Sequence, residues 1–175
     1  MAKIVSGRLS EIIFARFEAH EDLRQGLISI IKEKDIRSGL VLSITGALER
    51  ATLQRPSAVG RPSIPMELVD VPGPLEASGH GIIGVVEAPG FGKKVFGLGN
   101  DFVHGEPYTH VHLTVTSAEQ TVCGHLMDGC TIRSNFPASH FTIVLGRVEG
   151  ALIKMLGEPG DTPGSFIIGH ELVQF

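Results

Sequence analysis

Two neighbouring stretches of this chain alternate between apolar and polar residues, and this pattern constrains its fold more than any other feature. The stretches are residues 110–116 and 121–127, and the short polar segment 117–120 separates them. Such alternation is typical of half-buried strands, and a short polar connection is typical of a β-hairpin. The pattern therefore predicts an antiparallel strand pair whose core-facing side chains are Val111, Leu113, Val115, Val122 and Leu126.

The polar face of this predicted hairpin carries His110, His112 and His125. A symmetric hairpin pairs Thr116 with Thr121, and counting outward places His112 opposite His125, with His110 on the same face. Directly opposed Cβ atoms lie roughly 4.5–5.5 Å apart, and a zinc–imidazole bond is about 2.0–2.1 Å long. We therefore predict that the three histidines bind zinc or another divalent transition metal. The alternative is that they are ordinary polar residues on a solvated sheet face or at a subunit contact.

Tyr108 and Arg133 are the candidate catalytic residues. By alternation Tyr108 shares the histidine face, where it could donate a proton, orient a ligand or pack at a subunit contact. Arg133 follows the turn signal Asp128-Gly129. A tight symmetric turn places Arg133 on the core face, whereas a glycine bulge places it on the histidine face, where it could hold a carboxylate. The sequence leaves both registers open.

Three further polar side chains lie near the predicted site in the sequence. Cys123 precedes His125 by two residues and could add a softer metal ligand, and Cys130 is a weaker candidate. These two cysteines are too few for a disulfide scaffold and fit a reducing compartment. Glu106 lies in a predicted loop, so the direction of its side chain is open.

Length and composition indicate a globular chain rather than a disordered or membrane-spanning one. The 175 residues, 42% of them hydrophobic, predict a single domain over 1–175, with a core of about 8–156 and a C-terminal β extension of about 157–175. The 15 basic and 19 acidic residues do not suit a phosphate backbone. No apolar run approaches the roughly 18 residues of a membrane span, and the N-terminus lacks a signal peptide pattern, so we expect cytoplasmic residence.

The remaining pattern predicts an α+β fold, with a mostly antiparallel β-sheet and one main flanking helix. The expected helix covers 20–34, with acidic residues in its first turn, lysines in its last and an apolar stripe toward the sheet. The other expected strands cover 8–17, 38–55 with a bend near Thr45-Gly46, 80–87, 141–145, 148–156 and 166–175. Long loops are expected at 56–65 and 88–107.

Two segments resemble a known family, the plant and prokaryote conserved (PPC, or DUF296) domain. They are Ser43-Ile-Thr-Gly-Ala-Leu-Glu-Arg-Ala-Thr-Leu and His110-Val-His-Leu, the latter followed by Gly124-His-Leu-Met-Asp-Gly-Cys-Thr-Ile-Arg. The resemblance spans about 8–156. It implies an antiparallel sheet with flanking helices, a homotrimer, and a metal site, with zinc favoured, at the three histidines. Cys123 stands where the family motif has a glycine, and the 88–107 loop and the hairpin from Val148 look like additions.

Two rival interpretations find less support in the sequence. Cupins also place His-x-His on a strand, but they require a glutamate four or five residues later, whereas Glu119 lies seven residues after His112. Plant relatives of the PPC family are associated with DNA through a separate AT-hook. Gly60-Arg-Pro62 resembles the core of that hook but lacks a flanking basic cluster.

Two functions therefore stand as hypotheses. Three neutral imidazoles leave a zinc ion with an open position, which suits hydrolysis, hydration or lyase chemistry on a small carbonyl or carboxylate compound. The alternative is a non-catalytic trimeric module that binds DNA or protein and uses metal for sensing or stability. The acidic balance and the open site favour the enzyme, whereas the DNA-binding label common in the family favours the module.

Overall fold

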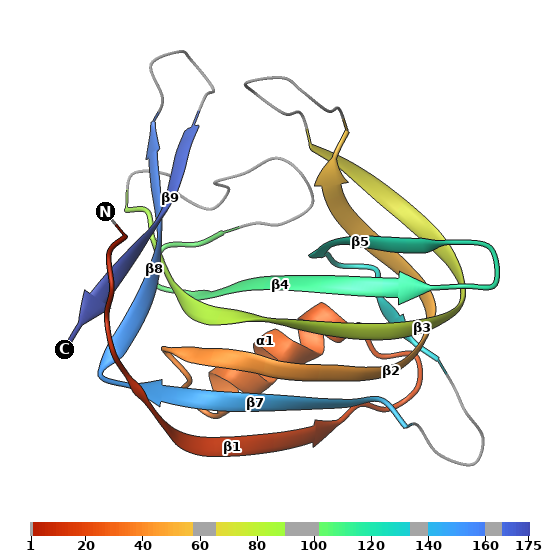
Figure 1. The fold of residues 1–175 in the computed structure, drawn as a ribbon, viewed down its shortest axis with the longest axis horizontal. Coiled ribbons are helices and arrows are strands. Elements are labelled where there is room, and N and C mark those ends of the chain that lie inside the picture. Colours follow the sequence, from red (N-terminus) through yellow and green to blue (C-terminus); the bar gives the residue numbers. More distant parts are fainter. Residues whose placement is uncertain (1, 58–65, 90–101, 134–139, 160–165) are drawn as a thin grey trace.

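The protein folds mainly as β-structure (Figure 1). A computed structural model describes residues 2–57, 66–89, 102–133, 140–159 and 166–175. Within these ranges the elements are β1 (Arg8–Arg16), α1 (Leu23–Glu33), β2 (Gly39–Pro56), β3 (Met66–Glu87), β4 (Pro107–Thr116), β5 (Thr121–Leu126), β6 (Thr131–Ile132), β7 (Thr142–Glu149), β8 (Ala151–Pro159) and β9 (Phe166–Gln174).

The expected α+β class is wrong, although the mostly antiparallel sheet is confirmed. Helix α1 has 11 residues, whereas β2 and β3 have 18 and 22. Strand β3 begins at Met66 and not near His80, so a segment without a predicted strand is in fact part of the sheet. Pro72 and Gly73 hide this strand in the sequence because both residues usually interrupt strands.

The sheet runs in the order β1-β7-β2-β5-β4-β3-β8-β9, with β6 on β2. Strand β2 also pairs with β3, so the central strands form a closed ring of paired strands in the order β2-β5-β4-β3. Strands β3 and β8 pair in parallel, whereas the other strand pairings described in this sheet are antiparallel. The C-terminal hairpin β8–β9 is thereby attached at the end of β3 where Val86 pairs with Met155.

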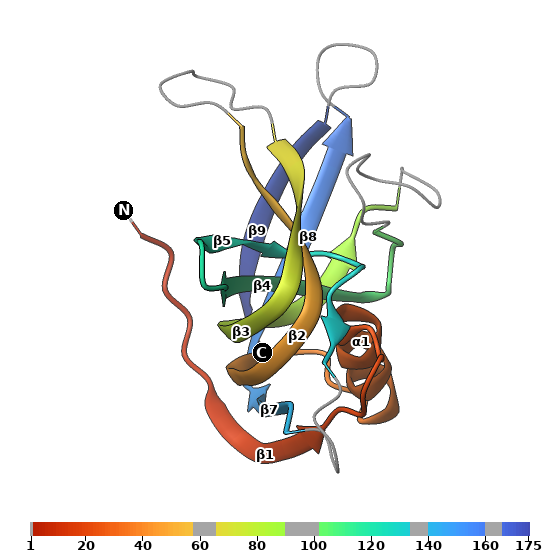
Figure 2. The same cartoon turned by 90° about the vertical axis from the view of Figure 1, so that its right-hand side faces the viewer.

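Helix α1 covers one side of the sheet (Figure 2). Its side chains Leu23, Leu27 and Ile31 are buried in the main apolar core, as the predicted stripe requires. Asp22 caps the helix by accepting a hydrogen bond from the backbone N–H of Gln25 at 3.0 Å. None of the helices in the described ranges is long and apolar enough to cross a membrane.

The predicted register of the β4–β5 hairpin is confirmed. Thr116 pairs with Thr121, and His112 pairs with His125. Each of the five predicted core-facing side chains of this hairpin belongs to the main core: Val111, Leu113, Val115, Val122 and Leu126. Because side chains alternate along a strand, burial of this apolar set directs the histidines to the opposite face.

Candidate metal centre

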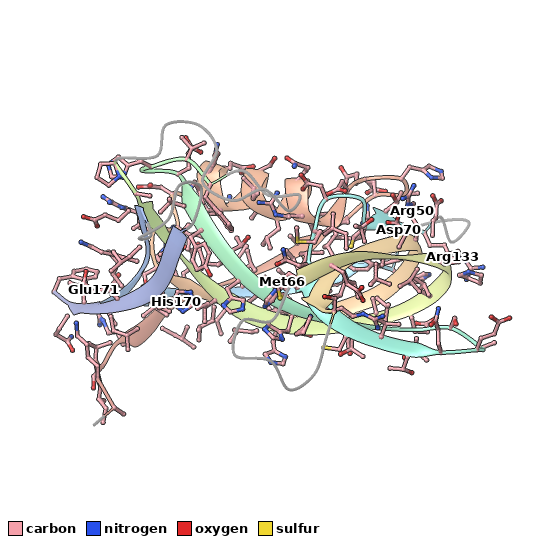
Figure 3. All side chains as sticks on the ribbon, turned by 90° about the horizontal axis from the view of Figure 1, so that it is seen from above. Arg50, Met66, Asp70, Arg133, His170 and Glu171 are labelled. Carbon is pink, nitrogen blue, oxygen red and sulfur yellow. The ribbon has the colours of Figure 1, made fainter. Side chains whose placement is uncertain are left out.

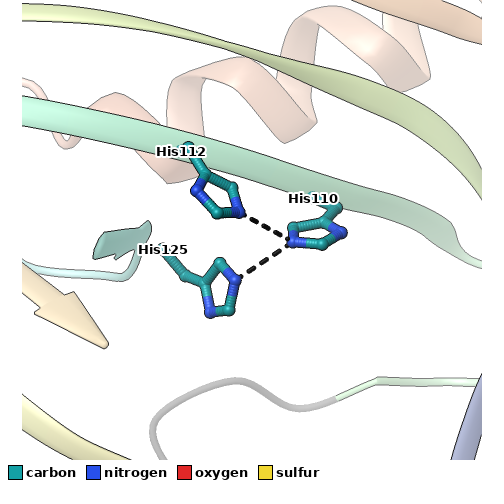
Figure 4. Close-up of side chains that lie close together, drawn as sticks. All are labelled: His110, His112 and His125. Atoms are coloured by element: carbon teal, nitrogen blue, oxygen red, sulfur yellow. Dashed lines mark hydrogen bonds between the residues drawn. The ribbon is translucent and has the colours of Figure 1, made fainter. Parts of the chain in front are cut away.

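His110, His112 and His125 converge on one point of the polar sheet face (Figure 4). His110 and His112 lie on β4, and His125 lies on β5. Their ligand nitrogens all lie within 4.8 Å of one another. His112 is exposed, while His110 and His125 are half-buried, so the cluster is open to solvent on one side.

The spacing of the imidazole nitrogens fits a shared cation. Nε2 of His110 lies 3.0 Å from Nε2 of His125 and 3.2 Å from Nε2 of His112. Two nitrogens bound to a tetrahedral zinc ion at about 2.0–2.1 Å lie roughly 3.3 Å apart. In addition, one nitrogen with one proton or one lone pair cannot satisfy two such neighbours at once. A cation among the three lone pairs would satisfy all of them.

Gln54 lies directly behind His125. It is on β2, where it pairs with His125 in the neighbouring strand, and its Oε1 lies 3.3 Å from Nδ1 of His125. When Nδ1 carries the proton and donates to Gln54, Nε2 of the same ring presents its lone pair to the cluster. Such outer hydrogen bonds commonly fix the tautomer of metal-binding histidines.

The surroundings favour the neutral, metal-binding form of the imidazoles. Burial, followed by the neighbouring His125, His112 and His170, lowers the pKa of His110 from 6.5 to about 4. Burial and His112 also lower the pKa of His125. At neutral pH the His110 imidazole is therefore uncharged, and one of its ring nitrogens can bind a metal without first losing a proton.

Tyr108 lies next to the cluster on the same strand and contacts His170 from β9. Its hydroxyl lies 2.7 Å from Nε2 of His170, and the ring centroids of His170 and His110 are 5.4 Å apart. Burial raises the pKa of Tyr108 to about 12 and lowers that of His170, so both side chains are neutral at pH 7. Either one can give or receive a hydrogen bond without a change of net charge.

Arg133, the other candidate catalytic residue, is not brought to the histidines. Its side chain is exposed, and its backbone N–H donates to the carbonyl of Ala47. Figure 3 shows it near Arg50 and Asp70, far from His170. The core-face register is wrong, because Ile132 and not Arg133 is the buried residue at this point. Arg133 faces away from the core, as the bulge register requires, but it lies away from the histidines.

The other polar candidates lie outside the cluster. Cys123 is exposed and does not join the three ligand nitrogens, and Cys130 is buried, with its Sγ donating to the carbonyl of Thr52 at 3.3 Å. Burial raises the pKa of Cys130 to about 12 and keeps the thiol protonated. Glu106 pairs with Lys32 of α1. The tripeptide Gly60-Arg-Pro62 lies outside the described residues.

The sequence did not identify Gln54 or His170 as site residues. Both reach the histidines through pairings between strands. Gln54 does so through β2 with β5, and His170 through β3 with β8 and then β8 with β9. No local pattern predicts these pairings. Both residues lie in segments predicted to be strands, 38–55 for Gln54 and 166–175 for His170, but strand prediction alone does not show which strands pair.

The family signature of the Plants and Prokaryotes Conserved (PCC) domain matches residues 5–137, a range that includes the three histidines. No curated protein sequence is significantly similar to this chain.

Solved structures resemble the fold. A metal-containing protein from Archaeoglobus fulgidus has a TM-score of 0.64 and 16% identity over 95% of this chain and 99% of its own. A plant- and prokaryote-conserved (PPC) protein from Pyrococcus horikoshii has a TM-score of 0.62 and 16% identity over 91% and 92%. A candidate DNA-binding protein from Bacteroides thetaiotaomicron has a TM-score of 0.60 and 16% identity over 95% and 98%. At these identities the likeness establishes the fold alone.

Proposed function

Given that the chain belongs to the Plants and Prokaryotes Conserved (PCC) domain family, we propose that its three histidines form the metal centre of an enzyme that acts on a small molecule. The observation that carries this proposal is the convergence of three imidazole nitrogens on one point with one side left open. Zinc is the metal we favour, because a site of three histidines with a free position is typical of catalytic zinc. The metal-containing relative from Archaeoglobus fulgidus adds support for a metal in this fold.

A cation bound here supplies Lewis acidity toward a carbonyl oxygen and acidifies water, as hydrolysis, hydration and lyase steps on carbonyl or carboxylate compounds require. The chain's own side chains have three tasks around it. Gln54 holds the proton of His125 on Nδ1, the half-buried position of His110 keeps this ring neutral, and Tyr108 with His170 offers a neutral hydrogen-bonding pair to a substrate oxygen.

The open coordination position can be tested with cobalt. The protein loaded with Co²⁺ should give a visible absorption spectrum of low coordination number, and azide should change this spectrum by occupying the free position. The variant His110→Ala should give no such spectrum, whereas His140→Ala, which removes an exposed histidine outside the cluster, should behave like the wild type. A cobalt spectrum that does not respond to azide would contradict an open catalytic site.

DNA binding is the second candidate, favoured by the structural likeness to the candidate DNA-binding protein from Bacteroides thetaiotaomicron. The formal net charge of −4 weighs against it. Retention on immobilised duplex DNA, measured from low to physiological salt, separates the two functions. A DNA-binding module would be retained with an affinity that falls steeply as salt rises, and the proposed enzyme would not be retained at physiological salt.

We also propose that the chain assembles as a homotrimer, the state that the family resemblance implies. A cluster of large apolar side chains on β1 and β2 supports self-association, since Ile12 is 55% exposed, Phe14 is 74% exposed and Leu42 is 39% exposed. Exposed apolar patches of this kind commonly mark protein contacts.

A further inference from the structure

A cavity of about 350 Å³ lies directly beside His110 and His125. This volume is within the usual range for small-molecule sites. The residues that line the cavity come from β4, β5 and the β8–β9 hairpin, together with Gln54 of β2 and Phe102. It opens next to the point where the histidine nitrogens converge, so a ligand in the cavity could also reach the metal.

The walls of the cavity are largely apolar and aromatic. Tyr108 and Met155 are buried and form, with Val86 and Ala88, a small apolar cluster separate from the main core, against which Phe102 packs. The ring of Tyr108 has its centroid 5.6 Å from that of Phe102 and 5.3 Å from that of His170. At these distances the rings pack against one another and form a continuous aromatic surface, against which a flat, apolar ligand can stack.

The polar groups of the cavity are all uncharged side chains. Among the described residues that line it, none is a lysine, arginine, aspartate or glutamate. The polar side chains present are those of Gln54, Tyr108, Thr109 and the histidines. A phosphorylated or otherwise polyanionic ligand would find one compensating charge, the metal itself, and would lose its hydration without replacement.

We propose that this cavity binds the flat, apolar body of a small monocarboxylate or carbonyl compound whose oxygen atoms reach the metal. This assignment rests on the proposed metal centre and names the substrate class that the centre accepts. The Tyr108 hydroxyl and His170 lie where this wall meets the histidines, since the His170 ring is 5.4 Å from that of His110, and there they orient the ligand's oxygen. Phe102, Tyr108 and Met155 provide the surface on which the ligand's body packs.

A pair of metal-chelating probes with the same head group and different bodies tests this assignment. Benzohydroxamate and acetohydroxamate are titrated into the Co²⁺-loaded protein, and their dissociation constants are read from the visible spectrum. We expect benzohydroxamate to bind about tenfold more tightly, because its ring is buried in the cavity. Phe102→Ala should reduce this preference to about threefold or less while acetohydroxamate binding stays unchanged, whereas His170→Ala, which removes a partner of the ligand's oxygen, should weaken binding of both hydroxamates. Thr114→Ala, on the histidine face outside the cavity, should keep the full preference.

The outcomes separate this assignment from the metal centre itself. Equal binding of the two hydroxamates to a cobalt-loaded protein would overturn the cavity assignment and leave the metal centre intact. Tighter binding of inorganic phosphate than of benzohydroxamate would also overturn it, because the cavity would then serve anions. Failure to bind cobalt at all would overturn the metal centre, and this assignment with it.

Discussion

Gln54 offers a test at the scale of a single residue, because its effect on the metal must pass through His125. We expect Gln54→Leu to lower zinc affinity by about 10- to 100-fold, the usual effect of removing a hydrogen bond behind a metal-binding histidine. Competition with a chromogenic chelator measures this change. Gln120→Leu, in the loop between β4 and β5, is the matched control and should leave the affinity unchanged. An unaltered affinity in Gln54→Leu would mean that Gln54 does not set the tautomer of His125.

His110 should make the stability of the metal-free protein depend on pH. Its pKa is lowered from 6.5 to about 4, so between these pH values the unfolded chain binds more protons than the folded protein. The stabilisation is therefore fully present above the unfolded pKa of 6.5 and is lost as pH falls toward 4. His125 and His170, whose pKa values are also lowered, act in the same direction.

We expect His110 to contribute about 1–2 kcal/mol to this loss, less than the full shift implies because its side chain is half-buried. Urea unfolding of the metal-free protein across this pH range measures the effect. His110→Gln should flatten the profile. A variant that loses stability with acid as steeply as the wild type would contradict the assignment of this pH dependence to His110.

At the scale of elements, the contact between β5 and β2 depends on Gly124. A Cβ at Gly124 would lie 2.7 Å from the backbone oxygen of Gln54 and 3.1 Å from Cβ of Leu53, so the two strands would have to separate. We expect Gly124→Ala to destabilise the fold by about 1–3 kcal/mol and to weaken zinc binding, because His125 and Gln54 move apart. Gly169→Ala, whose Cβ meets nothing within 4 Å, is the control. Urea unfolding and chelator competition measure both effects, and wild-type values for Gly124→Ala would contradict the account.

The β4–β5 hairpin also shows what the sequence can predict about the elements. Its alternating apolar residues fixed the register, and the register in turn predicted that His112 faces His125. The first half of β3 could not be predicted, because Pro72, Gly73 and Pro74 read as a strand break. In the fold Gly73 and Pro74 lie at a register shift between the pairs Arg50–Pro72 and Leu48–Leu75, and bulges of this kind are among the few places in a sheet where proline is found.

At the scale of the whole molecule, the mostly antiparallel sheet could be predicted from the sequence, but the predicted α+β class overstated the helical part of the fold. It also could not predict the cavity, whose walls come from β4, β5 and the β8–β9 hairpin. The parallel pairing of β3 with β8 brings Met155 and His170 to Tyr108. That pairing joins segments far apart in the chain, so it follows from the packing of the sheet and from no local pattern.

The oligomeric state is a property of the whole molecule. We expect the protein to sediment at about three times the 18.7 kDa of one chain. Phe14→Lys should shift the distribution toward monomer, because it places a charge within the exposed apolar cluster of β1 and β2. Arg8→Lys, on the same strand, should leave the assembly unchanged. A wild-type protein that sediments as a monomer at every concentration would contradict a homotrimer.

Zinc content per chain tests the central claim most directly. Elemental analysis of the purified protein, after reconstitution with zinc and removal of the excess, should give about one zinc per chain for the wild type and for His140→Ala, which removes an exposed histidine outside the cluster. His110→Ala should give almost none. A wild-type protein without stoichiometric metal, or a His110→Ala protein that retains it, would contradict a metal centre formed by His110, His112 and His125.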